Sequence, residues 1–97
     1  MRAALRETGS ILVRAPRDRV FEAIKEAMEG EPDLRAEAAR RVESPFSTFV
    51  LRDAPGGGTE VIHARRESLT LGASRRPRDE LRAQVELDLF RLAQKFS

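Results

Sequence analysis

The stretch from residue 77 to residue 96 constrains the fold more than any other part of the sequence. Its apolar side chains recur at steps of three and four residues, which places on one helical face Leu81, Val85, Leu89, Leu92 and Phe96. Pro77 suits the first helical position, and the acidic side chains of Asp79 and Glu80 match the helix dipole. A helix of about 20 residues spans about 30 Å, so the upstream segments must cover this stripe.

A second helix is predicted between Pro16 and Gly30. Pro16 suits a helix start, and Gly30 is a natural residue just beyond a helix end, where Pro32 prevents continuation. The apolar positions between them again follow helical spacing: Val20, Phe21, Ile24, Ala27 and Met28.

The remaining segments predict strands. Residues 8–15 contain a β-branched and apolar run, residues 46–52 are rich in Phe, Thr and Val, and residues 59–71 form a long return strand after the glycine-rich loop at 53–58. Residues 33–43 alternate between two sets of side chains as a strand does, although their Ala, Glu and Arg composition favours a helix. We interpret this segment as one strand, ended by Ser44-Pro45.

This order, β-α-β-β-β-α, predicts a single α+β domain over residues 1–97. Three sequential strands pair most simply as an antiparallel meander with both helices on one face, and the first strand joins an edge. The sheet pattern is unusual because Phe46 and Val50 point to one side while Phe49 and Leu51 point to the other. Either bulges shift the register, or a second subunit covers the extra apolar surface in a homodimer. The last helix carries a second apolar patch, formed by Ala83, Leu87 and Phe90.

Composition excludes several classes of function. The chain has 97 residues, 18 basic and 16 acidic side chains, a net charge of +2 and no cysteine. Disulfides, thiolate metal sites and cysteine nucleophiles are therefore excluded. Acids are interspersed among the arginines, so the basic stripe typical of nucleic-acid binding is missing. The start of the sequence lacks the apolar run of a signal peptide, and no segment reaches membrane-spanning length, so we expect a cytoplasmic protein.

Residues 9–24, Gly-Ser-Ile-Leu-Val-Arg-Ala-Pro-Arg-Asp-Arg-Val-Phe-Glu-Ala-Ile, resemble the opening of the START / polyketide-cyclase / birch-pollen-allergen-like superfamily. Members commonly begin with a strand, an Ala-Pro step and a helix containing a Val-Phe pair. The phrase Gly-Thr-Glu-Val-Ile at residues 58–62 is similar to their turn and following strand, and a long amphipathic helix closes the chain in both.

The resemblance implies a helix-grip fold, in which a curved antiparallel sheet wraps the last helix around an apolar pocket. This chain has fewer strands than members usually have, so the form is a truncated one. The implied function is binding of a small apolar or lipid-like ligand, or an interaction role, with no cofactor. The side chains expected to surround the ligand are Phe49, Leu51, Val61, His63, Val85 and Leu89.

No catalytic constellation or metal site is recognisable. His63 is the only histidine, and Arg65 and Glu67 share its strand face at two-residue spacing. One histidine on a strand is most simply a surface or edge residue, and the carboxylates lack metal-ligand spacing. The glycines at 56–58 lead into a strand, whereas a phosphate-binding loop leads into a helix, so they predict a hairpin.

The alternative function is binding of double-stranded RNA. Residues 16–96 follow the α-β-β-β-α order of a double-stranded-RNA-binding domain, whose second helix begins beside a basic cluster. Arg75, Arg76 and Arg78 stand at the corresponding place. Pro77, Asp79 and Glu80 occupy positions where residues that grip phosphates are expected, which favours the ligand-binding interpretation.

Overall fold

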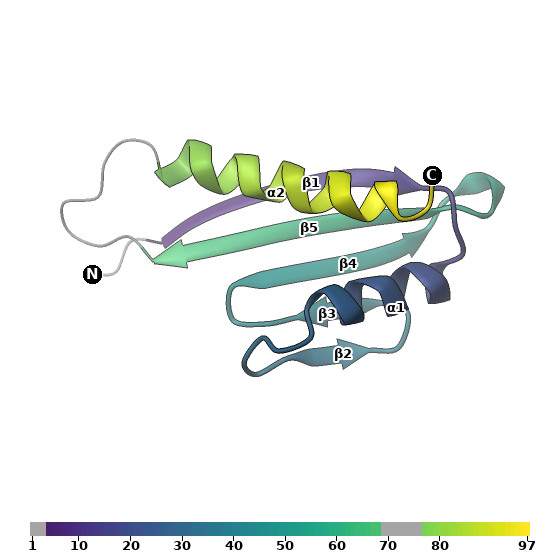
Figure 1. Ribbon diagram of the computed structural model, residues 1–97, viewed down its shortest axis with the longest axis horizontal. Coiled ribbons are helices and arrows are strands. Elements are labelled where there is room, and N and C mark those ends of the chain that lie inside the picture. The colour runs from purple at the N-terminus through teal and green to yellow at the C-terminus, as the bar shows by residue number, and fades with distance from the viewer. Residues whose placement is uncertain (1–3, 69–76) are drawn as a thin grey trace.

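The computed structural model describes residues 4–68 and 77–97, which form a five-stranded antiparallel sheet and two helices (Figure 1). The elements in chain order are β1 (Ala4–Val13), α1 (Arg17–Ala27), β2 (Arg35–Glu37), β3 (Arg41–Glu43), β4 (Ser47–Asp53), the short 3-10 turn η1 (Pro55–Gly57), β5 (Thr59–Ser68) and α2 (Pro77–Gln94). The strand order is β1-β5-β4-β3-β2, so the first strand lies at an edge. The predicted α+β class is confirmed.

The prediction of one strand over residues 33–43 was wrong. This segment is a hairpin of β2 and β3, in which the N–H of Arg40 donates to the carbonyl of Glu37 at 3.0 Å. Ala39, inside the turn, has φ 57°, a backbone conformation that residues other than glycine rarely adopt. The element order is therefore β-α-β-β-β-β-α, with one strand more than expected.

The other turns follow their local sequence signals. Gly56 and Gly57 have φ of 82° and 83° in η1, which joins β4 to β5 as the predicted hairpin. Helix α1 begins after Pro16, whose carbonyl accepts the N–H of Val20 at 3.2 Å, and Gly30 with φ 95° follows its end. The predicted strand at residues 59–71 is described as far as Ser68, and Leu69 and Leu71 lie outside the described residues.

The core lies between the helices and one face of the sheet. Helix α2 packs on β1 and β5, while α1 packs on β4 and β3. Alternate strand residues point to this face and are buried, among them Val13, Val42, Phe49, Leu51 and Val61. The predicted stripe of α2 is buried from Leu81 to Leu92, and Phe96 packs against the core just beyond the last helical residue.

Both helices described in residues 4–68 and 77–97 pack on the same face of the sheet, and neither covers the opposite face. The β4–β5 pairing runs without interruption from Ser47↔Arg65 to Asp53↔Thr59, so no bulge accounts for apolar residues on both faces. Val50 and Ile62, which pair with each other, lie on this outer face and are half-buried, and Leu12 is 58% exposed. Coverage of this face by a second subunit stays a prediction.

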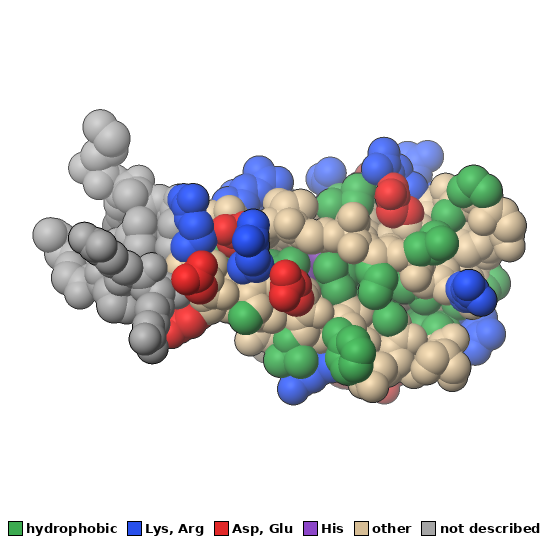
Figure 2. Space-filling view, turned by 90° about the horizontal axis from the view of Figure 1, so that it is seen from above, with side chains coloured by type: hydrophobic (Ala, Val, Ile, Leu, Met, Phe, Trp, Pro, Cys, Tyr) green, Lys and Arg blue, Asp and Glu red, His purple; other side chains and the backbone are tan. Residues whose placement is uncertain are grey.

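The second apolar patch predicted on the last helix is exposed. Leu87 and Phe90 are 39% and 58% accessible, and Ala83 is also exposed. Seen from the side of α2, hydrophobic side chains gather on the half of the molecule away from the grey atoms, among scattered charges (Figure 2). Single exposed apolar residues are normal on proteins of this size, so we assign no partner to this patch.

Candidate functional site

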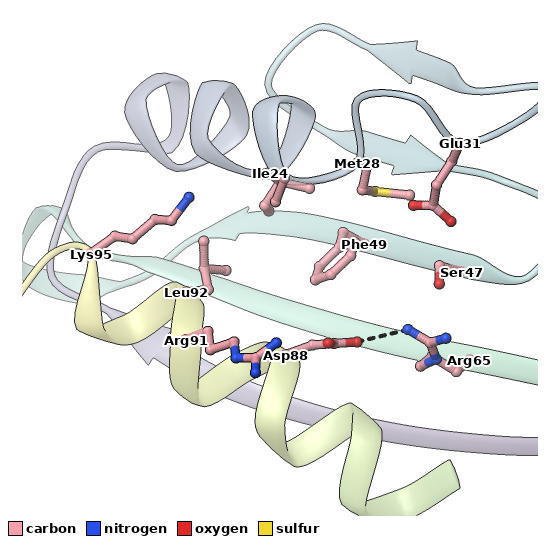
Figure 3. Close-up of a pocket in the computed structure, with 11 residues that line it drawn as sticks. Ile24, Met28, Glu31, Ser47, Phe49, Arg65, Asp88, Arg91, Leu92 and Lys95 are labelled. Atoms are coloured by element: carbon pink, nitrogen blue, oxygen red, sulfur yellow. Dashed lines mark hydrogen bonds and ion pairs between the residues drawn. The ribbon is translucent and has the colours of Figure 1, made fainter.

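A cleft of about 290 Å³ lies between α1 and α2, above β4 and β5 (Figure 3). The two helices cover different halves of the sheet face, and the space between them leaves Phe49 of β4 at the bottom. The residues around the cleft are Ile24, Ala27, Met28, Glu31, Ser47, Phe49, Arg65, Asp88, Arg91, Leu92 and Lys95.

The floor and inner walls of the cleft are apolar. Ile24 lies on α1, and Met28 is the residue just after its end, whose N–H donates to the carbonyl of Ile24 at 3.0 Å; they are 1% and 3% exposed. Phe49 and Leu92 complete this surface and are 8% and 6% exposed. The four side chains come from α1, the residue that follows it, β4 and α2, so only the folded protein presents them together.

One wall of the cleft carries a network of polar side chains centred on Asp88 of α2. Its Oδ2 accepts hydrogen bonds from Nε2 of His63 at 2.8 Å and from Nη1 of Arg65 at 3.0 Å. Its Oδ1 accepts one from Nε2 of Gln84 at 2.8 Å. Both carboxylate oxygens are therefore engaged, and α2 is tied to β5 by two positively charged or polar partners.

His63 lies beneath this network and is completely buried. Its ring stacks on that of Phe49 with the centroids 3.8 Å apart, and its Nδ1 lies 3.1 Å from the carbonyl oxygen of Thr48. A carbonyl and a carboxylate accept hydrogen bonds, so each ring nitrogen of His63 faces an acceptor, one on β4 and one on α2.

The pKa of Asp88 reflects these contacts. Burial of the carboxyl group acts to raise its pKa because it disfavours the charged form. The hydrogen bonds from His63, Gln84 and Arg65, together with the charge of His63, favour the carboxylate more strongly. As a result, the pKa of Asp88 lies below its ordinary value of 3.8, and the group is ionised at neutral pH.

The outer rim of the cleft is mostly positive. Arg91 and Lys95 are exposed and follow one another by one turn at the end of α2. Figure 3 shows the Lys95 side chain extending from α2 toward the side of α1. On the opposite side of the cleft, Oε1 of Glu31 accepts a hydrogen bond from the hydroxyl of Ser44 at 3.1 Å.

The structure places the six predicted ligand-binding residues in two different environments. Phe49 lines the cleft, and His63 lies directly behind it. The other four are packed in the hydrophobic core below or beside the cleft and do not line it: Leu51, Val61, Val85 and Leu89. The residues that replace them as cleft walls are Ile24, Met28 and Leu92.

The interpretation of His63 as a surface or edge residue was wrong, because its strand is internal to the sheet and its side chain is 0% exposed. Arg65 does join His63, but through Asp88, and the side chain of Glu67 lies outside the described part of the protein.

Asp88 and Gln84 are among the polar residues of the site that sequence reasoning missed, together with Glu31, Ser47, Arg91 and Lys95. The four-residue spacing of Gln84 and Asp88 and the position of Asp88 beside Val85, Leu89 and Leu92 place these two on the flank of the apolar stripe. An acidic side chain beside a buried apolar stripe indicates that a polar side chain of another element pairs with it. The partner, however, is 25 residues away in the sequence, and only the sheet brings it close.

The RNA-binding alternative cannot be tested on two of its three residues. Arg75 and Arg76 lie outside the described residues. Arg78 is exposed, and its Nε lies 3.9 Å from Oε1 of Glu7 on β1.

Within residues 4–68 and 77–97 we find no group of three or more histidine or acidic side chains that could hold a metal ion. In the same residues, neither helix has the length and apolar character needed to cross a membrane.

Comparison of the chain with models of protein families, with curated proteins and with solved structures finds no match.

Proposed function

We propose that this protein binds a small apolar molecule in the cleft between α1 and α2, as a shortened helix-grip domain. The observation that carries the proposal is the cleft itself, whose buried side chains are mainly apolar: Ile24, Met28, Phe49 and Leu92. Binding sites for small molecules are typically concave and apolar, with a few polar groups that fix orientation. Asp88, Arg65 and Ser47 supply such groups here.

The size of the cleft limits the ligand. Its volume of about 290 Å³ lies at the lower end of the usual range of roughly 300–1,000 Å³ for ligand pockets. A short alkyl chain or a single ring system fits this volume better than a steroid or a phospholipid. This size agrees with a sheet that has fewer strands than a full helix-grip domain.

The experiment uses the methyl group of Met28 as a reporter. The chain has only two methionines, so labelling the methionine methyl groups with ¹³C gives two signals, and Met28→Leu assigns the one in the cleft. Titration with neutral straight-chain alcohols up to octanol should shift the Met28 signal. We expect the affinity to rise about fourfold for each added methylene group, because burial of one methylene contributes about 0.8 kcal/mol.

A matched pair of variants tests the location. Ala27 lines the cleft and is exposed, so Ala27→Trp should fill the cleft and abolish the response to octanol without disturbing the core. Ala83→Trp, on the exposed side of α2, should leave the response unchanged. A Met28 signal that ignores octanol, or shifts equally with every chain length, would contradict the proposal.

A further inference from the structure

The charges around the cleft do not balance. Asp88 is faced by the guanidinium of Arg65 at 3.0 Å. Arg91 and Lys95 add two more positive charges to the rim, whereas Glu31 adds one negative charge. The five charged side chains that line the cleft therefore carry three positive and two negative charges.

The two carboxylates of the cleft accept hydrogen bonds from neighbouring side chains, whereas the two rim cations lack an ion-pair partner in the described residues. Asp88 accepts three hydrogen bonds, and Glu31 accepts one from Ser44. Arg91 and Lys95, by contrast, have no ion-pair partner within residues 4–68 and 77–97. They are also only four residues apart: Arg91 lies in the last turn of α2, and Lys95 follows its last residue, Gln94.

Another explanation for these cations is the dipole of α2. Basic side chains near a helix C-terminus are favourable because the last carbonyls carry a partial negative charge. That charge is equivalent to about half an elementary charge, which two full positive charges exceed. The dipole therefore accounts for only part of the positive charge at this end of the cleft.

An apolar surface begins directly beside the two cations. Leu92 lies between Arg91 and Lys95 in the sequence of α2 and forms the wall of the cleft together with Ile24. In Figure 3, Lys95, Leu92 and Phe49 follow one another from the end of α2 into the cleft. A ligand with a charged end and an apolar body matches this order of side chains.

We infer that the ligand is an amphipathic carboxylic acid, whose carboxylate contacts Arg91 and Lys95 and whose short apolar body lies on Ile24, Phe49 and Leu92. The inference rests on the proposed function, because it assigns the chemical class of the molecule bound in the same cleft. The exposed cations then capture the anion, and the buried apolar surface holds the rest of the molecule.

The test compares three ligands with the same alkyl chain and different heads: octanoate, octanol and octylamine. Their affinities at neutral pH are measured from the Met28 methyl signal. We expect octanoate to bind about tenfold tighter than octanol, which corresponds to two partly exposed ion pairs. Octylamine, which is positively charged, should bind more weakly than octanol.

Two double variants assign the effect to the rim. Arg91→Ala with Lys95→Ala should remove the preference for octanoate over octanol, because the two charges that contact the carboxylate are then missing from the rim. Arg6→Ala with Arg41→Ala removes the same charge at exposed positions away from the cleft and should keep the preference. A preference that survives the first double variant overturns the assignment to Arg91 and Lys95.

The remaining outcomes separate the inference from the proposed function. If octanol binds as tightly as octanoate, or octylamine binds tightest, the inference is wrong while the cleft remains a binding site. If none of the three ligands shifts the Met28 signal, the proposed function fails and the inference fails with it.

Discussion

Nε2 of His63 lies 2.8 Å from Oδ2 of Asp88, and this hydrogen bond joins the middle of the sheet to α2. His63 is completely buried, and the Asp88 side chain is 20% exposed. A charge without a partner is costly in such surroundings, so the stability of the helix–sheet contact depends on both residues.

Removal of the carboxylate should destabilise the protein. Asp88→Asn keeps the size of the side chain but removes the negative charge that faces His63 and the guanidinium of Arg65. Breaking a buried pair typically costs 3–5 kcal/mol, and the partial exposure of Asp88 reduces our expected loss to about 2 kcal/mol. Urea denaturation measures the change. Glu86→Gln, at an exposed position of α2, serves as the control and should have little effect. Equal stability of the two variants would contradict this role of the Asp88 carboxylate.

The contribution of Asp88 should depend on pH in a defined direction. Its pKa is lowered in the folded protein, so its contribution is fully present above the ordinary value of 3.8 and is lost as the pH falls through the lowered value. The difference in unfolding free energy between the wild type and Asp88→Asn should therefore shrink in strong acid. An NMR titration of the Asp88 carboxyl carbon should give a midpoint below 3.8.

A methyl group at residue 9 should push α2 away from the sheet. A Cβ atom there would lie 3.0 Å from Cγ1 of Val85 and 3.2 Å from Cδ1 of Leu89. We expect Gly9→Ala to lower the unfolding free energy by about 1–3 kcal/mol, the usual cost of overpacking. Because Gly9 pairs with His63, the same variant should weaken the His63–Asp88 contact.

The control for this variant is Ser10→Ala, whose side chain is exposed on the other face of the sheet. Replacement of glycine by alanine in an open strand is normally stabilising by roughly 0.5–1 kcal/mol. A gain in stability for Gly9→Ala would therefore show that α2 does not approach β1 so closely.

The turn between β2 and β3 offers a stabilising change. Ala39 has φ 57°, a backbone conformation that costs a residue other than glycine about 1–2 kcal/mol. Glycine avoids this cost, but it loses more conformational entropy on folding, which offsets roughly 0.5–1 kcal/mol of the gain. We therefore expect Ala39→Gly to raise the unfolding free energy by about 0.5 kcal/mol. Ala38→Gly, at a neighbouring position without positive φ, should lower it. Thermal denaturation of the two variants gives the comparison, and a loss for both would argue against this turn.

Features with a local physical cause were predictable from the sequence. The stripes of α1 and α2 follow from helical periodicity, and Pro16 and Pro77 fit the helix starts because proline lacks the N–H that a first turn leaves unpaired. The turn at 55–57 needs positive φ at two residues, and both are glycines. In each case the residues that predict the helix or turn are the residues that form it.

The hairpin of β2 and β3 was not predictable in this way. Alternation runs through residues 33–43 without glycine, proline or asparagine at the turn, because an alanine takes the left-handed conformation there. Pairing of β3 with β4, from Arg41↔Val50 to Glu43↔Thr48, fixes the second half of this segment in the sheet. Pairing with the next strand thus overrode the helical composition, and the turn at Ala39 divided the single strand that the alternation predicts.

The sequence by itself determined where the helices and most strands lie, because periodicity and φ restrictions act over a few residues. Only the tertiary structure decided the chemistry of the site. His63 carries no local sign of its burial or hydrogen bonds, which come from Thr48, Phe49 and Asp88, brought together by the β4–β5 pairing and by the packing of α2. The cleft likewise exists because α1 and α2 cover separate halves of one sheet, a relationship that no single segment encodes.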